Sequence, residues 1–267
     1  MKTLAQLGDL TGRCALVTGG AGHLGGAAAE ALVELGARVA ISDRDSDACH
    51  AAADALGRSR PGAVHALACD LADEAATRDL ARRTEATLGG LDILVHSAAY
   101  VGTTTAAGWA VPFATQTVEA WDAAMRVNVT PVFVLAQAAG AALARSGRGS
   151  IVVFSSIYGL VGPDLSLYDG TPMANPAGYG ASKGALQQLV RYLATVLAPA
   201  VRVNAISPGG VRRGQPPVFT GRYEARTPLG RMATEEDLKG AVAYLASDLS
   251  AYVTGQNLVV DGGWTTW

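Results

Sequence analysis

The stretch Thr18-Gly19-Gly20-Ala21-Gly22-His23-Leu24-Gly25-Gly26 decides the fold of this chain. It follows the apolar run Cys14–Thr18, which is typical of a β-strand, and it leads into Leu24–Leu35, which is typical of a helix. Glycines at such a turn let the chain reverse tightly and bring backbone N–H groups against a pyrophosphate, which the helix N-terminus stabilises. An ordinary strand–helix connection has the same appearance, so the turn alone only suggests a dinucleotide site.

The rest of the chain repeats this alternation. Short apolar runs predict strands at Cys14–Thr18, Arg38–Ser42, Val64–Cys69, Ile93–His96, Ile151–Ser155, Val201–Ile206 and Leu258–Val260. Ala- and Leu-rich segments predict helices at Leu24–Leu35, Ser46–Leu56, Glu74–Leu88, Val118–Arg145, Tyr179–Leu197 and Glu235–Ser247. Continuous hydrophobicity along the strands indicates burial on both faces, as in a parallel sheet. No linker divides residues 1–267, so we expect a single α/β domain with a doubly wound sheet.

Two segments interrupt the alternation of strands and helices. Residues 157–178 are rich in Gly, Pro and Asp, and residues 212–228 hold two consecutive prolines and several arginines. Loops of this length in a compact domain are usually functional. We therefore expect both segments to contact a substrate.

Composition narrows the class of partner. The 267 residues include 21 Lys and Arg against 23 Asp and Glu, a net charge of −2, which argues against nucleic-acid binding. Three cysteines without CxxC spacing make disulfides and a metal site improbable, and each is expected to be a small buried hydrophobe. No apolar run has the length of a signal peptide or membrane span, so we predict a soluble, cytoplasmic protein with a small-molecule substrate.

Acidic residues after the second and third strands suggest which dinucleotide is bound. Asp43 lies 18 residues after Gly25, where a carboxylate can accept hydrogen bonds from both ribose hydroxyls and repel a 2′-phosphate. Arg44 follows directly and could pair with that phosphate. The pattern favours NAD over NADP. Asp70, at the end of the third strand, could either touch the adenine rim or cap the next helix.

The most informative pair is Tyr179 and Lys183, which share a helix face because they are four residues apart. An ammonium beside a phenol favours the phenolate and lowers its pKa, so Tyr179 could take a proton from a substrate hydroxyl. Ser156 ends an upstream strand at the edge where ligands bind, although turn formation would also explain a serine there. Asn128, expected in mid-helix, needs buried partners, and a water leading to the lysine is one possibility.

Taken in order, these residues resemble the short-chain dehydrogenase/reductase family along nearly the whole chain. The resemblance implies a single-domain Rossmann fold with a seven-stranded parallel sheet, and a homotetramer or homodimer. It implies Tyr179 as acid/base, Lys183 on the nicotinamide ribose, Ser156 orienting the substrate and Asn128 positioning a relay water. The cofactor residues it implies are Gly19, Gly22, His23, Leu24, Gly25, Asp43, Arg44, Asp70, Leu71, Ala98, Ala99, Tyr179, Lys183, Pro208, Gly209 and Val211. The expected substrate residues are Ser156, Tyr158, Tyr179 and Arg212.

The chain departs from the family pattern in three places. His23 replaces the middle glycine of the turn, and we expect the backbone to tolerate it rather than the ring to bind phosphate. His96-Ser97-Ala98-Ala99 replaces the usual Asn-Asn-Ala-Gly. The insertion Gly159–Gly178 lengthens the segment between Ser156 and Tyr179, and carries hydrogen-bonding side chains at Asp164, Tyr168, Asp169 and Asn175.

These features predict an NAD-dependent oxidoreductase that interconverts a secondary alcohol and a ketone on a sugar, sugar acid or polyol. The alternative enzyme is an NADP-dependent ketoreductase of acyl, polyketide or natural-product type. A non-catalytic NAD-binding protein is disfavoured because both Tyr179 and Lys183 are present. Trp264 and Trp267, near the C-terminus, are expected either to plug the core or to lie at a subunit interface.

Overall fold

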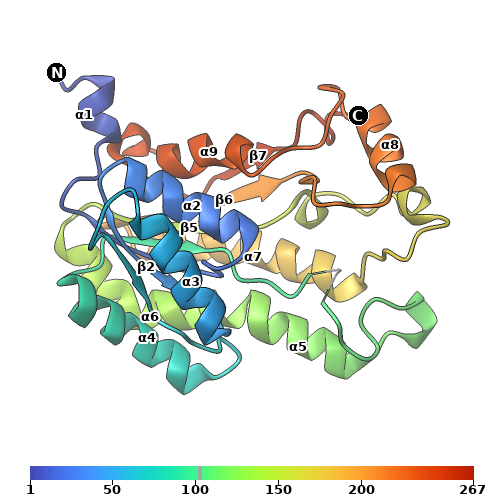
Figure 1. Ribbon diagram of the computed structural model, residues 1–267, viewed down its shortest axis with the longest axis horizontal. Coiled ribbons are helices and arrows are strands. Elements are labelled where there is room, and N and C mark those ends of the chain that lie inside the picture. The colour runs from blue at the N-terminus through green and yellow to red at the C-terminus, as the bar shows by residue number, and fades with distance from the viewer. Residues whose placement is uncertain (102–103) are drawn as a thin grey trace.

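The computed structural model describes residues 1–101 and 104–267, and a seven-stranded parallel sheet lies at its centre (Figure 1). The strands run in the order β3-β2-β1-β4-β5-β6-β7, which confirms the predicted doubly wound Rossmann fold. Because the order reverses between β1 and β4, the carboxyl ends of these two strands flank the crevice where such sheets bind ligands. The strand bounds are Cys14–Thr18 (β1), Arg38–Ser42 (β2), Val64–Ala66 (β3), Ile93–His96 (β4), Gly149–Phe154 (β5), Val201–Pro208 (β6) and Asn257–Val260 (β7).

Helices cover both faces of the sheet. One face carries His23–Glu34 (α2), Ser46–Gly57 (α3) and Glu236–Ala246 (α9), and the other carries Glu74–Leu88 (α4), Val118–Asn128 (α5), Thr130–Arg145 (α6) and Ala177–Val196 (α7). Two short helices lie outside these layers, Leu4–Gly8 (α1) and Pro217–Arg226 (α8).

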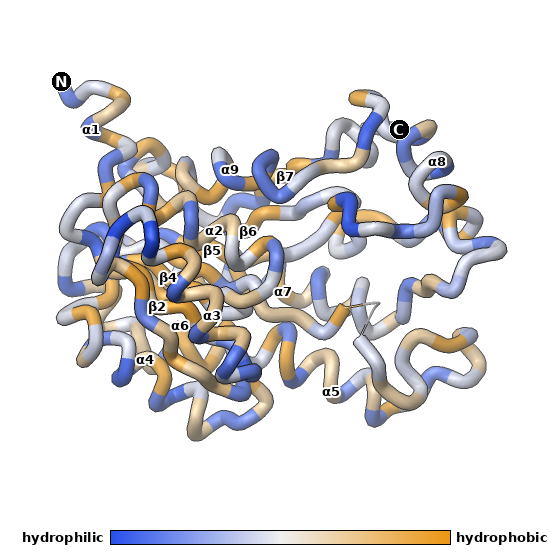
Figure 2. Tube along the Cα trace, in the orientation of Figure 1, coloured by the Kyte–Doolittle hydropathy of each residue, from blue (hydrophilic) through white to orange (hydrophobic). Residues whose placement is uncertain are grey.

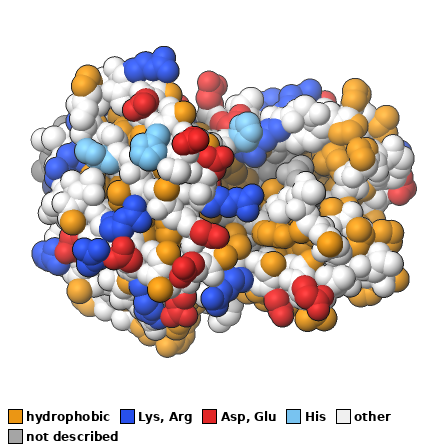
Figure 3. Space-filling view, turned by 60° about the horizontal axis from the view of Figure 1, so that its bottom comes forward, with side chains coloured by type: hydrophobic (Ala, Val, Ile, Leu, Met, Phe, Trp, Pro, Cys, Tyr) orange, Lys and Arg blue, Asp and Glu red, His pale blue; other side chains and the backbone are white. Residues whose placement is uncertain are grey.

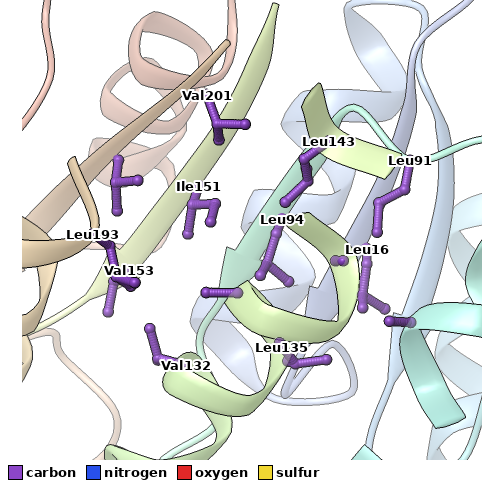
Figure 4. Packing of buried hydrophobic residues seen from close by; sticks show 14 of the residues in the cluster. Leu16, Leu91, Leu94, Val132, Leu135, Leu143, Ile151, Val153, Leu193 and Val201 are labelled. Atoms are coloured by element: carbon purple, nitrogen blue, oxygen red, sulfur yellow. The ribbon is translucent and has the colours of Figure 1, made fainter. Parts of the chain in front are cut away.

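The sheet separates two apolar cores. Leu16, Leu94 and Ile151 point toward α4, α6 and α7 (Figure 4), while Val17 and Val95 point toward α2 and α9. Hydropathy along the chain shows the same concentration of apolar residues at the sheet (Figure 2). The central strands β1, β4 and β5 are buried throughout, as predicted. The edge strands β3 and β7 are only half-buried, because each has a single neighbouring strand.

The prediction of one helix over Val118–Arg145 is wrong. The segment breaks at Val129, because Pro131 in the first turn of α6 has no amide hydrogen to donate to the preceding turn. By length and composition alone this segment could cross a membrane, but here its two helices pack beside α4 and α7. Asn128 is therefore the last residue of α5 rather than a mid-helix residue.

Smaller corrections concern the strand and loop boundaries. Strand β3 ends at Ala66 instead of Cys69, although the amides of Leu67 and Cys69 still donate to the chain that follows β2. The segment 212–228 contains helix α8, and 157–178 contains two 3₁₀ turns, Ile157–Gly159 and Leu165–Tyr168. The three cysteines are free and buried, as expected, and burial raises the pKa of each thiol.

Candidate active site

The glycine turn between β1 and α2 has the geometry that a dinucleotide cradle needs. Gly19 has a φ of +68°, and a Cβ at Gly25 would lie 2.0 Å from the carbonyl oxygen of Gly19, so both positions require glycine. The next loop packs closely as well, since a Cβ at Gly19 would lie 2.6 Å from the amide nitrogen of Ala98. The turn therefore fits a bound pyrophosphate.

His23 is accommodated without strain. It is the first residue of α2, and no non-glycine residue in the described part of the chain has a positive φ. Its ring is largely exposed, and Nδ1 lies 3.6 Å from Oε1 of Glu235, which also accepts a hydrogen bond from Nε of Arg213 at 3.1 Å. This agrees with the expectation that the backbone tolerates His23; a phosphate contact remains untested.

The side chains expected around the adenosine lie at the carboxyl ends of β2 and β3. Asp43 is half-buried, and its Oδ1 accepts a hydrogen bond from the amide of Arg44, whose side chain is exposed. Asp70 is exposed and accepts from the amide of Ala72 at 2.9 Å. The alternative that Asp70 caps α4 is wrong, because Asp73 is the N-cap and accepts from Ala76. Leu71 is buried beside this turn.

Helix α7 brings the predicted reacting side chains to the end of β5. Nζ of Lys183 lies 5.7 Å from the centre of the Tyr179 ring and donates to the carbonyl of Phe154 at 2.9 Å. Ser156 follows β5, is 6% exposed and shares a side-chain hydrogen bond with Tyr179. Ser155 ties the two elements together by donating to the carbonyl of Lys183 at 2.8 Å. Ser156, Tyr179 and Lys183 thus form one cluster.

Asn128 joins this cluster through its neighbours. Its side chain is fully buried and bonds to both main-chain groups of Tyr100. Its Nδ2 also donates to Oγ of Ser182 at 2.8 Å, and Ser182 donates in turn to the carbonyl of Tyr179 at 2.8 Å. With the amide committed in this way, the main-chain carbonyl is the group of Asn128 that is left to hold a relay water.

The expected nicotinamide side of the site lies after β6. A Cβ at Gly209 would lie 3.0 Å from the hydroxyl of Tyr223, and the amide of Gly210 donates to that same hydroxyl. Pro208 ends β6, and Val211 pairs with Ala233 in an isolated bridge. Helix α8 therefore reaches back over the end of β6 through Tyr223.

Insertion and α8 meet in a mainly aromatic cluster above Ser156 and Tyr179. Tyr158 and Tyr168 share a hydroxyl–hydroxyl hydrogen bond of 3.1 Å, and Nδ2 of Asn175 donates to Tyr168 at 3.3 Å. The ring of Tyr223 stacks on Trp264 with centroids 5.7 Å apart. The cluster is completed by Ile157, Leu167, Phe219, Met232 and Met173.

The charged side chains of these segments pair with one another. Asp164 pairs with Arg226, whose guanidinium also lies 4.7 Å from the Trp264 ring. Arg212, expected to touch substrate, is about half-exposed and pairs with Glu224. The structure thus places Tyr158 beside Ser156 and leaves Arg212 on the outer side of the lid.

Sequence comparison agrees with this geometry. The family model described as enoyl-(acyl carrier protein) reductase matches residues 19–265. The chain belongs to the short-chain dehydrogenase/reductase family.

Relatives of this short-chain dehydrogenase/reductase act on several kinds of alcohol. Cis-4-hydroxycyclohexanecarboxylate dehydrogenase of Sinomonas cyclohexanicum is 34% identical over 261 residues, covering 95% of this chain and 96% of the relative. D-threitol dehydrogenase of Mycolicibacterium smegmatis is 34% identical over 262 residues, covering 96% and 94%. A gluconate 5-dehydrogenase from Burkholderia cenocepacia J2315, crystallised with NADP and tartrate, has a TM-score of 0.85 at 29% identity, covering 99% of this chain and 100% of that one. The protein is thus an NAD(P)-dependent oxidoreductase.

In this short-chain dehydrogenase/reductase the pKa of Tyr179 does not follow the expected direction. Burial raises it, and the hydrogen bond with Ser156 lowers it only in part. Lys183, whose ammonium is directed to the carbonyl of Phe154, does not reverse the shift. Burial lowers the pKa of Lys183 itself to about 8. The expected lowering of the tyrosine pKa is therefore wrong for this structure.

Three buried polar residues of the short-chain dehydrogenase/reductase site escaped the sequence analysis as site residues. Ser182 links Asn128 to Tyr179, and Gln187 donates to Oγ of Ser155 at 3.2 Å. Both lie on the same face of α7 as Tyr179 and Lys183, so helical spacing could have found them. Thr18 was assigned to the strand only, yet its hydroxyl meets the ring of His96.

Proposed function

We propose that the protein is an NAD-dependent dehydrogenase that oxidises a secondary alcohol on a sugar, sugar acid or polyol. The observation that carries the chemistry is the cluster of Ser156, Tyr179 and Lys183 at the carboxyl end of β5. Relatives named for threitol and for a hydroxycyclohexane acid support a small hydroxylated substrate. The carboxylate of Asp43 supports NAD, because it would repel the 2′-phosphate of NADP.

The glycine turn fits the pyrophosphate, and Asp43 would hold the adenosine ribose. When bound, the nicotinamide accepts a hydride from the carbinol carbon of the substrate. Ser156 would orient the substrate hydroxyl, and Tyr179 would take its proton. Lys183 and the carbonyl of Asn128 would carry that proton onward. Because burial raises the pKa of Tyr179, we expect the oxidation rate to rise with pH.

The insertion supports a hydroxylated substrate. Tyr158 contacts the Ser156 hydroxyl through its amide at 3.2 Å, and its phenol forms a chain with Tyr168 and Asn175. Burial raises the pKa of both phenols, which keeps them neutral. Neutral phenols can both donate and accept hydrogen bonds, as recognition of a second hydroxyl requires.

Assembly into a homotetramer or homodimer, and a cytoplasmic location, are part of the same proposal. Hydrophobic side chains gather on the half of the surface in Figure 3 that carries α5 and α8. Among the exposed apolar residues are Val118, Trp121 and Phe133 on α5 and α6, and Val196 on α7. Exposed apolar surface of this kind supports a subunit interface.

The test is a comparison of initial rates with NAD and NADP over sugars, polyols and hydroxy acids, followed as reduced-cofactor absorbance. We expect faster turnover with NAD. Tyr179→Phe should lower kcat by about 10² to 10⁴ while NAD still binds, as measured by fluorescence. Tyr252→Phe, at a fully exposed site, is the matched control. Faster turnover with NADP, activity confined to steroids or acyl thioesters, or a fully active Tyr179→Phe variant would contradict the proposal.

A further inference from the structure

His96 is a buried imidazole at the carboxyl end of β4. The parallel register places it beside Thr18 on β1 and beside Val153 on β5. Both His96 and Thr18 have no exposed surface, and Nδ1 of His96 lies 2.9 Å from Oγ1 of Thr18. Nε2 is also buried, and it has no hydrogen-bond partner of good geometry among the described residues. A buried ring nitrogen in this state calls for an explanation.

The groups around Nε2 belong to the reacting site. The main chain of Asn128 and the ammonium of Lys183 both act on the imidazole. The chain geometry agrees, because Tyr100, four residues beyond His96, is bonded to Asn128, and Phe154, next to Val153, holds Lys183. Burial and the charge of Lys183 lower the pKa of His96 to about 3, so the ring is neutral.

The carbonyl of Asn128 is accessible to the ring because α5 ends there. An uninterrupted helix would use the amide of Val132 to bond this carbonyl. That amide donates instead to the carbonyl of Val129 at 3.1 Å, across the break before Pro131. The Asn128 carbonyl is thereby released from the helical ladder on the side that His96 occupies.

We propose that His96 is a positioning residue of the proton path, in which Nδ1 accepts the hydroxyl hydrogen of Thr18 and Nε2–H faces the main-chain carbonyl of Asn128. This proposal rests on the proposed dehydrogenase function. A carbonyl oxygen has two lone pairs. With one lone pair directed to the imidazole, the other keeps a fixed direction toward the Lys183 side of the site. His96 thus holds the relay without itself exchanging a proton.

Two substitutions separate the two ring nitrogens. His96→Gln can place an amide N–H near the position of Nε2, and His96→Asn can place one only near Nδ1. We expect His96→Gln to keep kcat within about threefold of the wild type, and His96→Asn to lower it about tenfold or more. The pH profile of kcat/KM should move upward by about one unit in His96→Asn only, with NAD affinity unchanged in both variants.

Nitrogen-15 NMR of the imidazole gives a readout that does not need turnover. We expect a neutral ring protonated at Nε2 that does not titrate between about pH 5 and 9, identified by its absence in His96→Gln. A ring protonated at Nδ1, a ring that titrates in this range, or equal losses of kcat and melting temperature in the two variants would overturn the proposal. If the wild type oxidises no alcohol, the proposed function fails while the NMR measurement still decides the contact.

Discussion

At the scale of single residues, the burial of Lys183 makes stability depend on pH. Its side chain is 3% exposed, and burial lowers its pKa to about 8 from 10.5. The unfolded chain keeps the proton up to the higher value, so the cost of burying the charge is fully present below about pH 8. It is released as pH rises from about 8 to 10.5.

We therefore expect the free energy of unfolding of the wild type to rise relative to Lys183→Met by on the order of 3 kcal/mol across this pH window. Urea denaturation at about pH 7.5 and 10.5 measures the change. Lys239→Met is the control with the opposite sign: desolvation lowers the pKa of Lys239, but hydrogen bonds from Glu34 and Glu30 outweigh it and raise the pKa. A constant difference between wild type and Lys183→Met would show that the ammonium is not desolvated.

At the scale of secondary-structure elements, the strands and most helices followed from the sequence because continuous apolar runs have few alternatives in an α/β chain. The break at Val129 did not, since the Ala/Leu pattern continues across Pro131 and conceals it. Tyr179 and Lys183 could be found because helical spacing is local. The contact between His96 and Asn128 depends on strand order and on a helix break, which no local pattern encodes.

The element that moves with substrate should be α8, and its tie to the insertion is testable. Arg226 pairs with Asp164 and lies over Trp264, so Arg226→Gln removes two contacts that hold α8 in place. Each contact is partly exposed and is worth about 1 kcal/mol or less. We expect KM for the alcohol to rise about three- to tenfold, with little change in NAD affinity and faster proteolysis within α8.

Arg82→Gln on α4 is the matched control, because Arg82 makes an exposed pair with Asp79 far from the site. It should leave both KM values and the proteolysis pattern unchanged. If Arg226→Gln behaves in the same way, the ion pair does not order α8. An equal rise in the KM values for alcohol and NAD would instead place the effect at the cofactor side.

At the scale of the whole molecule, the exposed apolar side chains on α5, α6 and α7 imply that part of this surface is covered in solution. Phe133 on α6 is 43% exposed, and a charge there would have to be desolvated on association. We expect the wild type to elute at a multiple of the 27.2 kDa chain mass, four times that mass for a tetramer, and Phe133→Lys to shift toward the monomer. Light scattering coupled to size exclusion measures both. Leu4→Lys, on α1, is the control, since Leu4 is 77% exposed and lies at the other end of the molecule from α5 and α8 (Figure 1). A monomeric wild type, or equal dissociation by both variants, would show that the α5–α7 surface is not the interface.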